Sequence, residues 1–179
     1  MKIAAIVGSI RKESLNKQLA LTIKDRYTEQ FELEILDIAS LPFYNQDEEN
    51  NPPQVVVDFK KKVSEADAVL IFTPEFNWSF PGVLKNALDW LSRVDFVLRG
   101  KAVHIAGVSG GPLGTIRAQL QLRQVLTGMR ANMMHPAGNE ILIGSAGQKF
   151  SDGRLTDEAT LTFLDGVMEK FIAHVQTSK

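Results

Sequence analysis

Cysteine is absent from this chain of 179 residues. Its absence excludes a disulfide framework, a thiolate zinc site, a Cys-ligated iron–sulfur cluster and a cysteine nucleophile. An excess of charge of one sign is also missing, because 20 lysines and arginines stand against 21 aspartates and glutamates. A net charge of -1 gives little long-range attraction for nucleic acid or an anionic membrane. We therefore expect neither as a partner.

Long hydrophobic runs are missing too. The longest stretch without a charged residue, 102–116, contains a histidine, a proline and four glycines, which does not suit a membrane span. The apolar run at 3–7 is too short for a signal peptide. We expect no membrane insertion and a cytoplasmic protein. With 44% hydrophobic residues and the length of one α/β domain, residues 1–179 are predicted to form a single domain.

Short β-branched runs alternate with longer amphipathic segments five times along the chain. The runs that predict strands are 3–7, 31–38, 68–73, 103–108 and 140–143. Helices are expected after Ser14, over Val56 to Val63, from about Pro81, over Ala118 to Met129, and from Thr156 as N-cap. This alternation predicts a flavodoxin-like, doubly wound, five-stranded parallel sheet with helices on both faces, in three α/β/α layers. Residues 45–53 and 144–153 are predicted to be surface loops.

The loop after the first strand carries hydroxyl, amide and guanidinium groups at the start of a helix. It reads Gly8-Ser9-Ile10-Arg11-Lys12-Glu13-Ser14-Leu15-Asn16-Lys17. Because ligands bind at the carboxyl ends of strands in an open parallel sheet, this composition predicts a site for a phosphate monoester. The alternative is a capped helix behind a basic turn. The loop is neither a Walker A sequence nor a dinucleotide fingerprint.

The loop after the third strand, 73–82, combines two prolines, three aromatic residues and Glu75. A rigid loop of this kind presents backbone N–H and C=O groups to the edge of a planar heterocycle, with aromatic walls beside it. The alternative is a rigid turn that buries its aromatic residues at a subunit contact.

The loop after the fourth strand, Ser109-Gly110-Gly111-Pro112-Leu113-Gly114, allows a ligand to approach the backbone closely, although a plain turn has the same composition. Residues 107–111 also match Gly-x-Ser-x-Gly, which suggests a hydrolase with Ser109 as nucleophile and His135 or His174 as base. The glycines and proline after Ser109 delay the following helix, which disfavours that hydrolase. The histidines lack metal-ligand spacing, so no metal is expected.

These three loops, taken in chain order, resemble those of the NADPH-dependent FMN reductase family. Its members are flavodoxin-like enzymes that include bacterial quinone, chromate and azo reductases. Residues 8–16 are similar to GSxRxxSxN, residues 74–90 to PEYNxSxPGxLKNAIDW, and residues 109–123 to the glycine loop and its helix. The resemblance covers most of the chain. Phe76 stands where the family commonly has tyrosine, and Trp78 where it often has a small residue. These departures leave the preferred electron acceptor open.

The resemblance implies bound FMN, with Ser9, Arg11, Ser14 and Asn16 holding its phosphate. The full set of implied cofactor-binding residues is Ser9, Arg11, Ser14, Leu15, Asn16, Pro74, Glu75, Phe76, Asn77, Ser109, Gly110 and Gly111. The resemblance further implies that NADPH or NADH passes hydride to flavin N5. A small-molecule acceptor would then take the electrons in ping-pong order, and this acceptor would be a quinone, an azo or nitro compound, or chromate. No catalytic side chain is required. Family members of this type are homodimers or homotetramers.

Three other functions stay open at the level of sequence. A flavodoxin-type electron carrier would bind FMN without a nicotinamide site, but such carriers usually dock through strongly acidic surfaces, which this chain lacks. A redox-sensing or purely binding flavoprotein would hold FMN without turnover. The third is the Ser109 hydrolase.

Overall fold

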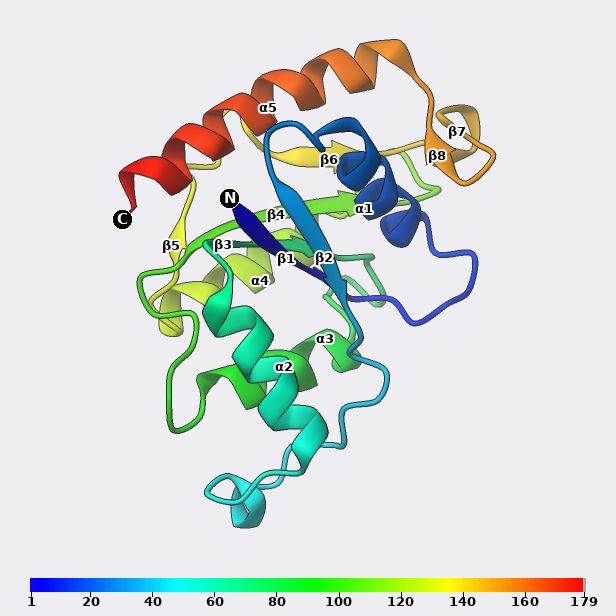
Figure 1. The fold of residues 1–179 in the computed structure, drawn as a ribbon. Helices are drawn as coiled ribbons and strands as arrows, with labels where there is room; N and C mark the ends of the chain where they lie inside the picture. Colours follow the sequence, from blue (N-terminus) through cyan, green and yellow to red (C-terminus); the bar gives the residue numbers. More distant parts are fainter. Residues whose placement is uncertain (179) are drawn as a thin grey trace.

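The computed structural model describes residues 1–178, and its centre is a parallel sheet (Figure 1). The principal strands are β1 (Lys2–Val7), β2 (Glu32–Leu36), β3 (Ala68–Phe72) and β4 (Ala102–Val108). Their order is β2-β1-β3-β4, and a fifth position beside β4 completes the sheet. The strand order is 2-1-3-4-5, and the predicted flavodoxin-like fold is thereby confirmed.

Two short strands share the fifth position, where the sequence predicts one. β5 (Asn132–Met133) pairs with the start of β4, and β6 (Ile141–Ile143) pairs with its end. Between them the chain leaves the sheet through a turn closed by a hydrogen bond from the Asn139 N–H to the Pro136 carbonyl. Proline cannot donate to a strand ladder, so the edge strand is interrupted there.

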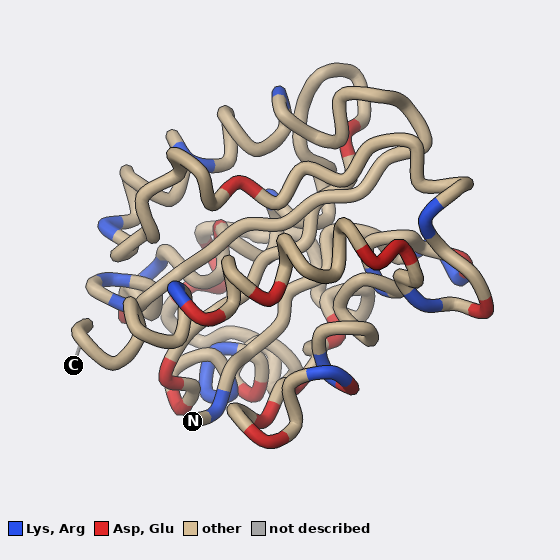
Figure 2. Tube along the Cα trace, turned by 90° about the horizontal axis from the view of Figure 1, so that it is seen from above, with Lys and Arg blue, Asp and Glu red and all other residues tan. Residues whose placement is uncertain are grey.

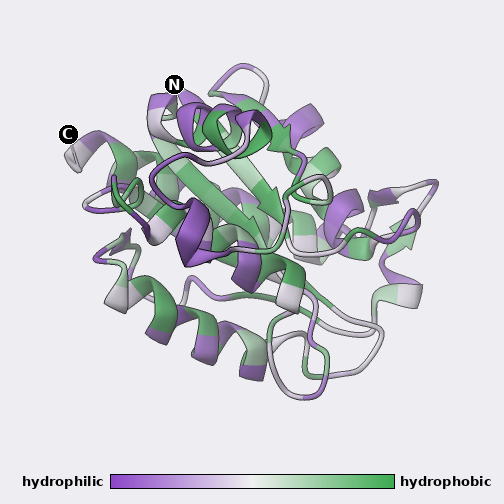
Figure 3. Cartoon of the chain, turned by 90° about the horizontal axis from the view of Figure 1, so that it is seen from below, coloured by the Kyte–Doolittle hydropathy of each residue, from purple (hydrophilic) through white to green (hydrophobic). Residues whose placement is uncertain are grey.

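Helices cover both faces of the sheet, in the three layers predicted. α1 (Leu15–Arg26) and α5 (Glu158–Thr177) pack on one face, while α2 (Gln54–Glu65), α3 (Gly82–Ser92) and α4 (Ile116–Gly128) pack on the other. The central strands are apolar on both sides, as Figure 3 shows. Alternate residues of each strand enter the two cores, so the strand ends are held rigidly.

Two details of the C-terminal part differ from the sequence prediction. The N-cap of α5 is Asp157, not Thr156: the Asp157 carboxylate accepts from the Thr160 N–H at 2.9 Å. A carboxylate suits this end of a helix because the helix dipole is positive there. The segment 144–153 is not only loop. It contains a 3-10 turn, Ala146–Gln148, and β7 (Phe150–Ser151), which pairs with β8 (Arg154–Leu155).

Acidic and basic residues are interspersed along the chain trace (Figure 2). Within residues 1–178 the helices are all too short or too polar to cross a bilayer.

Candidate functional site

The three predicted loops meet at the carboxyl ends of β1, β3 and β4. They enclose a cavity of about 180 Å³, which we call the first cavity. Its lining contains ten of the twelve implied cofactor residues together with Val108; the ten are Ser9, Arg11, Ser14, Leu15, Asn16, Pro74, Glu75, Phe76, Ser109 and Gly110. Asn77 and Gly111 adjoin this lining in the chain without belonging to it. Loops separated by up to 100 residues in the sequence therefore form one pocket.

Hydrogen-bond donors gather at the start of α1. The Ser14 hydroxyl oxygen caps the helix by accepting from the Lys17 N–H at 3.2 Å. The N–H groups of Leu15 and Asn16 have no acceptor within the helix, because the first turn of any α-helix leaves such groups unpaired. Arg11 is exposed, and within residues 1–178 it has no ion-pair partner. These donors, with the Ser9 hydroxyl, fit a phosphate monoester.

The Asn16 side chain has a role that its loop motif does not predict. Its Nδ2 donates to the Val108 carbonyl at 3.1 Å, and its Oδ1 accepts from the Val108 N–H at 3.0 Å. Both atoms are buried, so the amide ties the start of α1 to the end of β4. The first and third loops are thereby fixed to one another.

Gly107 allows β4 to approach the second loop. A Cβ atom at this position would overlap the Thr115 hydroxyl and would lie 2.8 Å from the Thr73 carbonyl oxygen. Only glycine avoids both contacts. The glycine two residues before Ser109 therefore sets the spacing between the second and third loops.

A tight turn projects two aromatic rings beside the first cavity. Phe76 and Ser79 exchange backbone hydrogen bonds of 2.9 and 3.0 Å around Asn77 and Trp78, which have φ of 50° and 64°. Positive φ at both central residues defines a type I′ turn; asparagine tolerates it, whereas a bulky residue such as Trp78 rarely does. The turn leaves Phe76 60% and Trp78 69% exposed. Strained turns of this kind are typical of binding sites.

The Glu75 carboxylate joins this turn to α4. Its Oε2 accepts from the N–H groups of Arg117 and Ala118 at 3.0 and 3.2 Å, and its Oε1 pairs with the Arg117 guanidinium at 3.2 Å. The N-cap residue of α4, Thr115, provides no capping hydrogen bond, so Glu75 supplies the anion that the helix start favours. The sequence carries no local signal for this link, because the partners lie 42 residues apart.

Trp78 and Ser79, at the far end of the turn from Glu75, also contact α4. The Arg117 guanidinium lies 4.2 Å from the centre of the Trp78 ring, a cation–π contact. Gln121 donates to the Trp78 carbonyl at 2.8 Å and accepts from the Ser79 hydroxyl at 2.7 Å. The aromatic turn is therefore positioned by α4 as well as by its own backbone.

Removing the Glu75 carboxylate should loosen this attachment. We expect Glu75→Ala to lower the free energy of unfolding by about 1–2 kcal/mol, the range for losing a helix cap. The matched control, Glu75→Gln, keeps an acceptor oxygen and should lose less. Urea unfolding followed by circular dichroism measures both. Equal stability of Glu75→Ala and wild type would show that the carboxylate does not hold the loop.

The arrangement around Ser109 does not resemble a hydrolase triad. The Ser109 hydroxyl donates to the Gly111 carbonyl at 3.1 Å, and α4 begins only at Ile116. His174 contacts the Asn132 carbonyl beside the start of β4, and His135 follows β5, which pairs with that start, whereas Ser109 follows the end of β4. Within residues 1–178 no three or more His, Asp or Glu side chains are grouped to hold a metal.

Comparisons with known proteins agree with this geometry. The family model for NADPH-dependent FMN reductase matches residues 1–148. The chain belongs to the NADPH-dependent FMN reductase family. It is 40% identical over 179 residues to a 2-hydroxy-1,4-benzoquinone reductase of a Burkholderia species, covering 98% of this chain and 97% of the relative. It is 36% identical to a quinone reductase of Escherichia coli K12, covering 100% and 97%.

A solved structure extends the similarity to three dimensions. The flavoenzyme NAD(P)H:(acceptor) oxidoreductase FerB from Paracoccus denitrificans superimposes with a TM-score of 0.91 at 34% identity, covering 99% of this chain and 98% of that one. This member of the FMN reductase family is thus a flavoenzyme that binds FMN and acts as an NAD(P)H-dependent FMN and quinone reductase. The predictions of FMN as cofactor, of NAD(P)H as electron donor and of an oxidoreductase as enzyme class are confirmed.

Proposed function

We propose that the first cavity holds FMN, with the phosphate on Ser9, Arg11 and the first-turn N–H groups of α1. The ring would lie between residues 74–77 and the loop Ser109-Gly110-Gly111. The observation that carries this assignment is the convergence of all three loops on one cavity. No side chain is assigned as a catalytic acid or base.

Bound FMN supplies two-electron hydride chemistry, and the protein supplies position and electrostatics. The contacts of Glu75 and Gln121 described above hold residues 75–79, and Asn16 holds Val108, two residues before Gly110. Rigid donors of this kind orient a planar ring without reorganisation during turnover. Donor and acceptor would use the same open face in turn, which predicts ping-pong kinetics.

We propose that the acceptor is a planar quinone that carries negative charge, such as a hydroxyquinone. Two relatives are named as reductases of a hydroxyquinone and of quinones. Phe76 and Trp78 offer exposed aromatic walls, and the side chain of Arg117 is 37% exposed above the Trp78 ring. A cation beside an aromatic wall favours an anionic aromatic acceptor over a neutral one.

Steady-state kinetics with two acceptors tests this assignment. For Arg117→Gln we expect the KM for 2-hydroxy-1,4-benzoquinone to rise about two- to fivefold, the range for an exposed charge contact. The KM for neutral 1,4-benzoquinone should not change. Phe76→Tyr, which restores the family hydroxyl, serves as a control that keeps the charge. An equal change for both quinones would contradict a role for charge in acceptor choice.

We also propose that residues 1–179 work as one FMN-binding domain in a homodimer or homotetramer in the cytoplasm, where its nicotinamide donor is abundant. Leu113 of the third loop and Leu120 of α4 are 56% and 59% exposed, which supports an interface on this part of the molecule. Sedimentation of wild type and Leu120→Glu would test the assembly, with dissociation of the variant as the expected result.

A further inference from the structure

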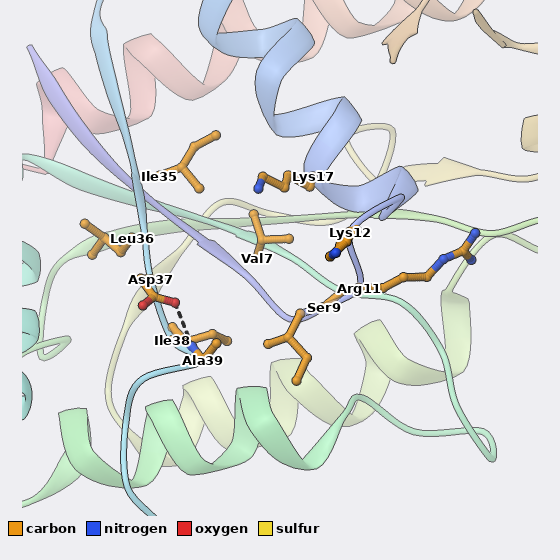
Figure 4. Close-up of a pocket in the computed structure, with 11 residues that line it drawn as sticks. Val7, Ser9, Arg11, Lys12, Lys17, Ile35, Leu36, Asp37, Ile38 and Ala39 are labelled. Carbon is orange, nitrogen blue, oxygen red and sulfur yellow. Dashed lines mark hydrogen bonds between the residues drawn. The ribbon is translucent and has the colours of Figure 1, made fainter. Parts of the chain in front are cut away.

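A second cavity, of about 440 Å³, lies on the other side of the first loop, between the ends of β1 and β2 (Figure 4). It shares only Ser9 and Arg11 with the first cavity. The remaining lining residues are Val7, Ile10, Lys12, Lys17, Ile35, Leu36, Asp37, Ile38 and Ala39. Its volume is within the range of small-molecule sites. The proposed position of FMN leaves this cavity unused.

The lining combines apolar walls with a few charged groups, as ligand pockets do. Figure 4 shows the Arg11 side chain extending away from this cavity, whereas the amines of Lys12 and Lys17 lie close to Val7. Both lysines are exposed, and among residues 1–178 neither has a carboxylate partner. Two unpaired cations above an apolar wall favour an anion attached to an apolar body.

Besides the apolar walls and the two lysines, the second cavity contains the carboxylate of Asp37. It follows the last residue of β2 directly, and its Oδ1 accepts from the Ala39 N–H at 2.9 Å. In dinucleotide-binding α/β folds, an acidic residue downstream of the first-strand turn accepts from the ribose hydroxyls. This chain lacks the glycine fingerprint of those folds, so lysine side chains would have to bind the phosphate here. Here β2 pairs with β1, so the Asp37 carboxylate and the phosphate-type loop flank one crevice.

The structure therefore points to a second nucleotide site. We propose that the second cavity binds an adenosine 5′-phosphate group, with Asp37 accepting from the ribose 2′,3′-hydroxyls and Lys12 and Lys17 binding phosphate. Two dinucleotides carry this group beside a flavin or nicotinamide: NADH and FAD. The inference rests on the proposed function, because the occupant would lie beside the phosphate of FMN.

Two other exposed arginines are engaged elsewhere. Arg93 lies over the Tyr44 ring and Arg99 lies over the Phe96 ring, and neither lines the second cavity. A 2′-phosphate would face the Asp37 carboxylate, which disfavours it. We therefore expect the second cavity to prefer a free ribose diol, and thus NADH over NADPH.

Calorimetric titration of AMP into the FMN-loaded protein tests the site. Asp37→Asn keeps an acceptor for the Ala39 N–H but loses the charge, and we expect it to weaken AMP about tenfold, a typical loss for a hydrogen bond to a charged group. The double variant Lys12→Ala/Lys17→Ala should weaken both AMP and inorganic phosphate by a similar factor. Lys24→Ala, which removes an exposed lysine from the far end of α1, should change neither.

A second probe isolates the ribose contact. Wild type should bind 2′-deoxy-AMP more weakly than AMP, and this difference should disappear in Asp37→Asn. Equal AMP affinity in wild type, Asp37→Asn and the double lysine variant would overturn the proposal. Release of FMN by AMP, seen in the flavin absorbance, would also overturn it, because AMP would then occupy the first cavity.

Two further measurements identify which dinucleotide supplies the adenosine 5′-phosphate group. If the occupant belongs to NADH, Asp37→Asn raises the KM for NADH; if it belongs to FAD, the same change weakens FAD and leaves FMN affinity unaltered. Either result supports the proposal. A protein that retains FMN and reduces quinones but shows no AMP response contradicts this inference alone. A protein that shows the AMP pattern without retaining FMN contradicts the proposed function instead.

Discussion

Replacing Arg11 with alanine is expected to weaken FMN binding roughly 10- to 150-fold, the factor that corresponds to a lost hydrogen bond to a charged group. The guanidinium lies in the lining of the first cavity with no carboxylate partner among residues 1–178, so its charge is available to a phosphate. Unlike the backbone donors of the first turn, it carries a full charge and has the geometry to bind two phosphate oxygens at once.

Quenching of flavin fluorescence during titration measures this dissociation constant. Arg11→Lys keeps the charge but loses the planar fork, so its affinity should fall between those of alanine and wild type. Arg99→Ala, which removes a charge over the distant Phe96 ring, is the matched control and should bind FMN normally. Wild-type affinity in Arg11→Ala would refute the phosphate assignment.

Acid is expected to destabilise the fold through His104. This residue is 1% exposed in β4; its Nε2 lies 2.9 Å from the Asn139 carbonyl, and its Nδ1 has no partner. The pKa of His104 is lowered from 6.5 to about 4, mainly by burial and also by the nearby charges of Arg123 and His174, while the Asn139 carbonyl opposes the shift.

The sign of the effect follows from proton binding. Between pH 6.5 and 4 the unfolded chain binds a proton at His104 that the folded chain does not, so stability falls as the pH falls through this window. A shift of this size corresponds to a loss of about 3 kcal/mol by pH 4. Above pH 6.5 the contribution of His104 is constant.

Urea unfolding from pH 7.5 to 4 in wild type and His104→Leu isolates this contribution, because the carboxylates titrate equally in both. The variant should lose about 3 kcal/mol less over this range than wild type. An identical pH dependence in the two proteins would show that His104 does not titrate in this way.

The parts of the structure that sequence analysis predicted are those set by local pattern. The buried run of β3 and the donor-rich loop after β1 each lie within a few residues, and their chemistry is visible without knowledge of distant contacts. The parallel order also follows, because alternating strands and helices have few ways to pack.

The parts that were missed depend on distant partners. Asn16 bonds to Val108 across 92 residues, and Glu75 bonds to Arg117 across 42, and neither spacing has a local signal. One omission did have a signal: Asp152-Gly153, with φ of 49° and 75°, is a typical type I′ pair that predicts the β7–β8 hairpin. The second cavity was missed because residues 35–39, which form one of its walls, carry no binding motif of their own.

The most direct test of the central claim is the visible absorption spectrum of the purified protein after incubation with FMN and desalting, before and after anaerobic addition of NADPH or NADH. We predict flavin bands that survive desalting and bleach rapidly with a nicotinamide donor, then return when a quinone is added. A colourless protein, or one whose flavin bands persist in the presence of both donors, would contradict the assignment of this chain as an FMN-dependent reductase.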